Sequence, residues 1–75
     1  MEFDLGDVVE LDFGKSYLVM GKCNIDLYDY YFVTEREDEG NAIIIKKEPE
    51  KEEILVVKDE NEIRKALECI SGIKN

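Results

Sequence analysis

The side chains that could perform catalysis in this chain are few. Histidine, the usual general base at neutral pH, does not occur among the 75 residues. The candidate hydroxyl nucleophiles are Ser16, Thr34 and Ser71, and none of them lies in a recognisable catalytic motif. The sequence has no glycine-rich phosphate loop, and neighbouring carboxylates are expected on any chain this acidic. We therefore predict that the protein is not an enzyme and uses no cofactor.

The residues best suited to recognition are the tyrosines of one aromatic segment. Tyr28, Tyr30 and Phe32 stand at alternate positions. Tyr31 and Val33 alternate with them, so a strand would send the two sets to opposite faces of a sheet. One face must enter the core, which leaves one or two tyrosines outside, beside carboxylates, as in many protein-binding patches. The alternative is that these tyrosines only pack across the sheet with their hydroxyls in water.

Acidic side chains gather in the segments 35–39, 48–53 and 59–62. Helix capping explains the last of these segments. We expect the first two on adjacent hairpin tips, where they either keep a surface solvated or imitate nucleic-acid phosphates for a basic groove on another protein. The partner-binding candidates from the aromatic and acidic segments are Tyr28, Tyr30, Tyr31, Glu35, Glu37, Asp38, Glu39, Glu50 and Glu52.

Two patterns bear on metal binding. The segment 35–40 imitates the first half of an EF-hand loop, but the bidentate position falls on Lys46. The two cysteines, Cys23 and Cys69, cannot complete an ordinary structural zinc site without histidine. No metal site is therefore predicted. We expect both cysteines to be reduced thiols that serve as small core residues, with a disulfide as the alternative.

The charge balance restricts the partners. Asp and Glu number 19 against 10 Lys and Arg, which gives a net charge of −9 at pH 7. Such a field repels nucleic acid and anionic lipid, so we expect no direct nucleic-acid or membrane binding. An unknown protein partner with a basic surface, or a homodimer, is compatible with it. No segment approaches the roughly 18 apolar residues of a membrane span. The first four residues lack signal-peptide features, so we expect a soluble, cytoplasmic protein.

Hydrophobic alternation and turn residues predict five short strands, over about 7–13, 16–23, 27–36, 42–47 and 53–58. Val9, Leu11 and Phe13 share one face of the first strand. Gly14 suits a tight turn with positive φ, and Gly21 indicates a bulge or bend in the second strand.

A helix is predicted over about 60–71. Asp59 and Glu62 have the spacing of a capping box at its start. Gly72 is placed to end it, with a hydrophobic contact from Ile73 beyond. One apolar stripe runs along the helix, formed by Ile63, Ala66, Leu67 and Ile70.

These elements predict a single domain over residues 1–75 that is mainly β. Five antiparallel strands in a meander would form a coiled sheet or a small SH3-like barrel, followed by one C-terminal amphipathic helix. The helix would either plug one end of the barrel or lie across one face of a flatter sheet.

The segment GDVVEL at 6–11, followed by a glycine turn and an apolar strand, resembles the opening of many small SH3-like barrels. The chain also resembles short acidic bacterial and phage domains of unknown function, which share a tyrosine-rich middle strand, an acidic loop and a closing acidic helix. That resemblance implies a phage or mobile-element protein and carries over no catalytic residues. The barrel-shaped ribonuclease toxins begin similarly, but this chain lacks their basic surface.

We therefore predict a non-catalytic protein-binding or accessory module that acts through the aromatic strand. The alternative function is an acidic inhibitor, or nucleic-acid mimic, that occupies a basic groove on a partner.

Overall fold

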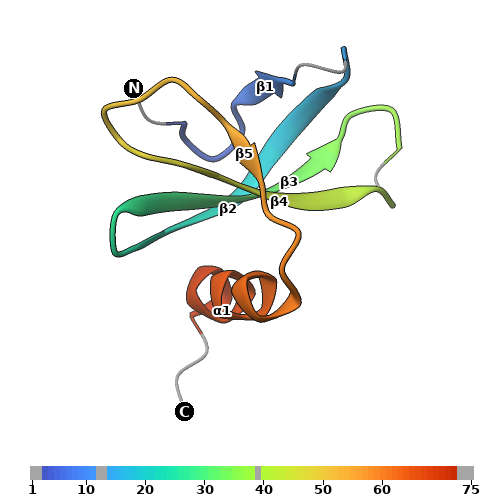
Figure 1. Cartoon of the computed structure of the whole chain (residues 1–75). Helices are drawn as coiled ribbons and strands as arrows, with labels where there is room; N and C mark the ends of the chain where they lie inside the picture. Colours follow the sequence, from blue (N-terminus) through green and yellow to red (C-terminus); the bar gives the residue numbers. More distant parts are fainter. Residues whose placement is uncertain (1–2, 12–13, 39, 73–75) are drawn as a thin grey trace.

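The computed structural model describes residues 3–11, 14–38 and 40–72. The strands form one antiparallel sheet in the order β1-β2-β3-β4-β5, which curls into a half-barrel with α1 beside it (Figure 1). The elements are β1 (Val8–Glu10), β2 (Ser16–Ile25), β3 (Tyr28–Glu35), β4 (Ala42–Lys47), β5 (Leu55–Val56) and α1 (Glu60–Ser71). The predicted mainly-β meander with a C-terminal helix is confirmed, although β1 and β5 are shorter than expected.

The sheet buries side chains on both of its faces. One face carries the inner cluster, formed by Val9, Leu11, Tyr17, Val19, Tyr31, Val33 and Ile45, with Phe3, Ile43 and Ile54 packed against it. The other face carries the helix-side cluster, formed by Tyr30, Ile44, Val57 and Ala66, with Ile25, Tyr28, Phe32, Ile63 and Ile70 packed against it. The helix therefore covers the face opposite the inner cluster and does not plug an end of the barrel.

A β-bulge bends β2 in the middle. The pairing of β2 with β3 shifts between Val19 and Gly21, which leaves Met20 as the extra residue. Gly21 is buried beneath Ile70 of α1, where a side chain would have no room. The bulge expected at this glycine is confirmed, and it turns β2 from the inner cluster toward the helix.

The turn and cap residues behave largely as their types predict. Gly14 has a φ of 78° in the turn before β2, while Asp12 and Phe13 lie outside the described residues. The Asp59 side chain accepts a hydrogen bond from the Asn61 N–H, so it is the N-cap of α1.

The other end of α1 also follows prediction, with one difference along its stripe. Gly72, with a φ of 74°, ends the helix and its N–H donates to the Cys69 carbonyl. Ile73 lies outside the described residues. Leu67 of the predicted apolar stripe is 41% exposed, whereas Ile63, Ala66 and Ile70 pack in the helix-side cluster.

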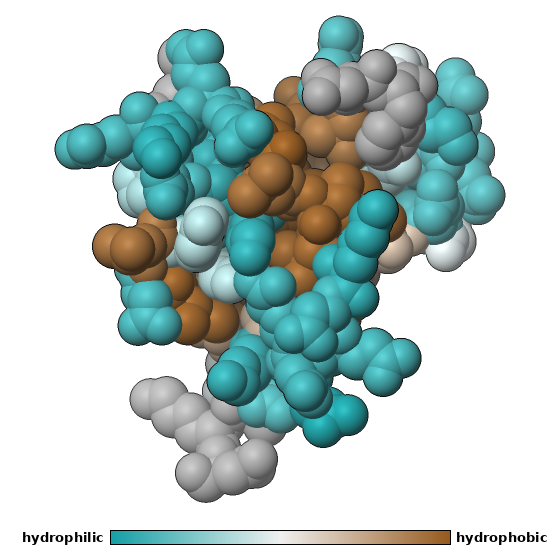
Figure 2. Space-filling view, viewed as in Figure 1, coloured by the Kyte–Doolittle hydropathy of each residue, from teal (hydrophilic) through white to brown (hydrophobic). Residues whose placement is uncertain are grey.

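Apolar surface remains visible around β5 at the centre of one face, with hydrophilic side chains on either side (Figure 2). Leu55 and Val56, the two residues of β5, are both partly exposed there. Within the described residues, no helix is long and apolar enough to cross a membrane.

Candidate functional site

The tyrosines of β3 do not form an exposed patch. Tyr31 is 1% exposed in the inner cluster, and Tyr30 is 6% exposed in the helix-side cluster. Tyr28 is half-buried at the edge of the helix-side cluster. The expectation that one or two tyrosines lie outside is therefore wrong for Tyr30 and Tyr31. Alternation correctly assigns Tyr30 and Tyr31 to opposite faces of β3. However, α1 covers the face that would otherwise be exposed to solvent.

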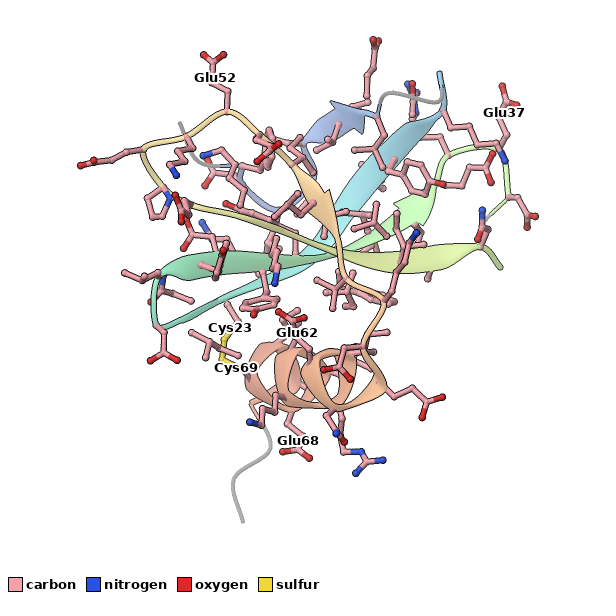
Figure 3. The ribbon with its side chains drawn as sticks, in the orientation of Figure 1. Cys23, Glu37, Glu52, Glu62, Glu68 and Cys69 are labelled. Carbon is pink, nitrogen blue, oxygen red and sulfur yellow. A yellow bond between two sulfur atoms is a disulfide. The ribbon has the colours of Figure 1, made fainter. Side chains whose placement is uncertain are left out.

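Glu62 of α1 is the centre of a polar cluster between the helix and the sheet (Figure 3). Its Oε2 atom accepts hydrogen bonds from the Tyr30 hydroxyl and from Lys46 Nζ, each at 2.6 Å. The Lys46 ammonium also lies 4.6 Å from the centroid of the Tyr28 ring. Glu62 was expected to complete the capping box with Asp59, but it ties α1 to β3 and β4.

Two groups of this cluster, Glu62 and Tyr30, have shifted pKa values. The hydrogen bond from Lys46, followed by that from Tyr30, lowers the pKa of Glu62 below its ordinary value. Burial and the Glu62 carboxylate raise the pKa of Tyr30 to about 12. Both shifts move the pKa values further from 7. The arrangement is therefore better suited to holding α1 on the sheet than to transferring protons near pH 7.

The two acidic loops lie at opposite ends of the sheet. Glu37 lies in the β3–β4 loop and Glu52 in the β4–β5 loop, and Figure 3 shows them on opposite sides of the view. The six residues of β4 separate these loops by about 20 Å, at roughly 3.3 Å per residue. The expectation of adjacent acidic tips is wrong, because consecutive hairpins of a meander turn at alternate ends.

Each acidic loop has another turn as its neighbour. A hollow of ≈ 440 Å³ joins the β3–β4 loop to the turn before β2, through Glu35 and Glu37 on one side and Gly14 and Lys15 on the other. A second hollow, of ≈ 400 Å³, joins Leu27 of the β2–β3 turn to residues 48–50 of the β4–β5 loop. The predicted acidic candidates are thus divided between the two ends.

The individual acidic candidates differ in their exposure and in the bonds that their carboxylates make. The Glu35 carboxylate accepts from the Asn41 side chain at 2.8 Å and lies 3.6 Å from Lys15 Nζ, so it is a structural residue of its loop. Asp38 accepts from the Gly40 N–H in the same loop. Glu39 lies outside the described residues. The exposed candidates are Glu37, Asp38, Glu50 and Glu52.

A disulfide joins Cys23 of β2 to Cys69 of α1. Their Cα atoms are 6.0 Å apart, a separation that suits the bond. Cys23 is half-buried and Cys69 is exposed. The expectation of reduced thiols in the core is therefore wrong on both counts, because the path of α1 across the sheet brings the two cysteines together near the surface.

An exposed apolar patch, missed from the sequence, lies on β1 and the neighbouring part of β2. Val8 and Leu18 are direct cross-strand partners that face away from the inner cluster. Val8 is 47% exposed, Met20 in the bulge is 54% exposed, and Leu5 is 62% exposed. We call Leu5, Val8, Leu18 and Met20 the β1-edge patch. The sequence indicates this patch, since Val8 must point to the opposite face of the strand from its buried neighbour Val9.

The backbone at this edge of the sheet is available for pairing. The Asp7 carbonyl accepts from the Val19 N–H, and the Leu11 N–H donates to the Lys15 carbonyl, so residues 7 and 11 face β2. Because hydrogen-bonding directions alternate along a strand, the backbone groups of Val8 and Glu10 face the open edge. β1 is the terminal strand of the sheet.

The β1 edge also carries negative charge. Asp4, Asp7 and Glu10 are exposed beside the apolar side chains. Asp4 is partly neutralised by Lys22, whose Nζ lies 3.1 Å from its carboxylate. The edge thus combines apolar side chains, backbone groups that face away from β2, and carboxylates within one stretch of chain.

Metal binding finds no support in the described part of the chain, where no group of ≥ 3 His, Cys, Asp or Glu side chains is placed to hold an ion. Comparison with known proteins gives no relative from which a role could be transferred. No protein-family model, curated protein or solved structure matches the chain.

Proposed function

We propose that this chain is a non-catalytic protein-binding module whose β1 edge pairs with an extended, basic segment of another protein. The observation that carries the proposal is the β1-edge patch, where large apolar side chains are exposed along a terminal strand. Adding a strand to an exposed edge supplies main-chain hydrogen bonds and pockets for alternate side chains.

The exposed apolar side chains of this edge favour a site that binds an added strand over an ordinary solvated surface. Edge strands are usually protected from aggregation by short length, by charge or by a covering element. β1 has three residues and the carboxylates of Asp7 and Glu10, but it exposes apolar side chains as well. Residues 6–11 run beside β2 with Val8, Leu5 and Met20 exposed around them. The other terminal strand, β5, has two residues and follows the glutamates of the β4–β5 loop, so it offers a shorter template.

The charge of the edge selects the partner. Two copies of this chain paired through β1 would bring Asp7 and Glu10 of each copy together, in proteins that each carry −9. Like charges opposite each other destabilise paired strands. Val8 and Glu10 share one face of β1, whereas Asp7 lies on the other. A segment that carries both basic and apolar residues on each face would instead place cations beside these carboxylates and apolar side chains against Val8 and Met20.

Catalysis has less support than binding. The cluster of Tyr30, Lys46 and Glu62 holds α1 on the sheet, and the pKa shifts of Tyr30 and Glu62 move both groups away from neutral pH. We also propose that the protein is cytoplasmic, that it originates from a phage or mobile element, and that its sheet is related to SH3-like barrels.

The proposal is tested with a synthetic peptide that repeats Lys-Lys-Val-Val, so that each face of the extended peptide carries both residue types, titrated into the isotope-labelled protein. We expect the backbone amide signals of Val8 and Glu10 to shift, and the shifts to weaken between about 50 and about 500 mM salt because charge pairing is screened. Val8→Lys should abolish the shifts. The matched control is Leu27→Lys, which changes an equally apolar residue that is 71% exposed at a distant turn.

The outcomes of this titration are distinct. Shifts at Val8 and Glu10 that survive in Leu27→Lys but disappear in Val8→Lys support the proposal. Absence of binding, or shifts confined to the acidic loops or equal in both variants, would overturn it. A concentration-dependent rise in molecular mass without peptide would show instead that the edge pairs with a second copy.

A second candidate function is an acidic inhibitor that occupies a basic groove. It is favoured by the exposed carboxylates of Glu37, Asp38, Glu50 and Glu52. Their division between two ends of the sheet requires a groove long enough to contact both loops. Replacing Glu37, Glu50 and Glu52 together by lysine should abolish binding of a polylysine probe if this function holds, whereas Val8→Lys should not.

A further inference from the structure

The Cys23–Cys69 disulfide links the last turn of α1 directly to the sheet (Figure 3). These are the chain's two cysteines, so the bond has no competing thiol within the protein. Cys69 is an exposed residue and Cys23 is half-buried. We infer from this exposure of the residue that a small thiol in solution reaches the sulfur of Cys69 without unfolding of the domain.

The two ends of α1 are held by different means. The first turns are fixed by the N-cap Asp59, which follows soon after β5, and by Glu62 in its bonds to Tyr30 and Lys46. Ala66, in the middle of the helix, is fully buried. The last turn is held by the packing of Ile70 over Gly21 and by the disulfide.

We propose that Cys23–Cys69 is a thiol–disulfide exchange site, at which a dithiol reductant releases the last turns of α1 from the sheet. A thiolate of the dithiol attacks the Cys69 sulfur, breaks the bond to Cys23 and leaves Cys23 as a thiolate that takes up a proton. The second thiol of the reductant then attacks the mixed disulfide and frees Cys69 as a thiol. Two electrons pass to the cysteine pair, and the dithiol leaves as its own disulfide.

The redox state of the protein's surroundings would determine whether this bond is formed or broken. Stable disulfides are typical of oxidising compartments, whereas cytoplasmic proteins meet dithiol reductants continuously. A bond that is accessible and joins a helix end to a strand would respond to that difference. Its opening would uncover Gly21, which lies beneath Ile70, and Phe32, the cross-strand partner of Gly21 that packs against the helix-side cluster. The side chains on the helix side of β3 would then become accessible, independently of the β1 edge, while the backbone pairing of β3 with β2 and β4 remains.

The experiment compares hydrogen exchange of the oxidised and reduced proteins, with the reduced protein made by dithiothreitol under native conditions. The protein is first treated with excess oxidised glutathione, the glutathione is removed, and the protein thiols are counted by maleimide labelling. We expect no labelled thiol before reduction and both cysteines labelled after it. Exchange should rise at least tenfold in residues 67–71, while residues 28–35 of β3 remain as protected as in the oxidised protein.

The double variant Cys23→Ser with Cys69→Ser is the control, since it should show fast exchange in residues 67–71 with or without dithiothreitol. The proposal is overturned if the cysteines do not pair under oxidation, or if reduction requires denaturant. It is also overturned if exchange in α1 does not change on reduction. Loss of protection in β3 together with α1 would mean that the bond maintains the whole domain, and would overturn the local release.

Discussion

Ile70 of α1 lies over Gly21 of β2 so closely that a Cβ atom on the glycine would overlap the isoleucine Cγ2. The β-branched side chain of Ile70 is stiff at χ1 and cannot easily turn away. The contact fixes where the second half of the helix sits on the bulged strand. It also explains why the bulge carries glycine, because the helix occupies the space of a side chain.

Gly21→Ala should therefore destabilise the protein. We expect the free energy of unfolding to fall by about 1–3 kcal/mol, as for other overpacked cores. In an Ile70→Ala background the same substitution should cost far less, because the overlapping Cγ2 atom is gone. Urea unfolding of the four proteins in this double-mutant cycle measures the coupling. Gly40→Ala is the control, since the nearest atom to its added Cβ is 3.4 Å away, and a cost equal to that of Gly21→Ala would contradict the overlap.

Replacing Glu62 by glutamine should weaken the attachment of α1 and change the acid response. The amide oxygen can still accept from Lys46, but the ion pair is lost, so we expect a loss of about 1–2 kcal/mol for this partly exposed cluster. Because folding lowers the pKa of Glu62, its stabilisation is complete above the ordinary value of 4.5 and is lost as pH falls through the lower folded pKa.

The check is thermal unfolding of wild type and Glu62→Gln across the acidic range. The difference between them should shrink as pH falls below 4.5, the ordinary glutamate value. Glu60→Gln makes the same charge change in the first turn of α1, at an exposed residue, and should alter stability little. A constant difference at every pH would show that the Glu62 carboxylate is not held in its ionised form.

Tyr30 should control the alkaline response. Its pKa rises from 10.0 to about 12 on folding, so the neutral hydroxyl is favoured in the folded state. This contribution to stability is present below pH 10 and is lost as pH rises toward 12. Ultraviolet titration of tyrosinate should show a late ionisation that Tyr30→Phe removes. The same late ionisation persisting in Tyr30→Phe would assign it to another tyrosine.

Removing the N-cap should loosen the start of α1. Asp59→Ala deletes the carboxylate that accepts from the Asn61 N–H at 3.2 Å, and such losses cost about 0.5–2 kcal/mol. Hydrogen exchange should quicken in the first turn and remain unchanged in β2 and β3. Lys58→Ala, at the exposed neighbouring position, should have little effect. Equal effects of the two variants would mean that the cap contributes nothing.

Much of the fold could be predicted because local chemistry dictates it. Alternation identifies Val9 and Leu11 as inward residues, Gly14 takes the positive φ that its turn requires, and Asp59 caps the helix. These features depend on residues close together in sequence. They do not depend on which other element arrives later to cover a face.

The candidate site was harder to predict because it depends on distant parts of the chain. Nothing in the alternation of Tyr30 and Tyr31 shows that α1 will cover one face while the inner cluster fills the other. The Cys23–Cys69 pair spans 46 positions and needs the path of the helix across the sheet. Glu62 fits a local capping pattern, yet it is drawn away by Lys46 and Tyr30.

Tyr30 and Tyr31 are neighbours in sequence, yet they belong to separate hydrophobic clusters on opposite sides of one strand. Inserting or deleting a single residue in β3 would exchange the faces of every later side chain in that strand. Both clusters would then receive the wrong residues at once. In a sheet with one solvated face, the same change would disrupt a single cluster. Length variation during evolution should therefore be confined to the loops, while β3 keeps an invariant number of residues.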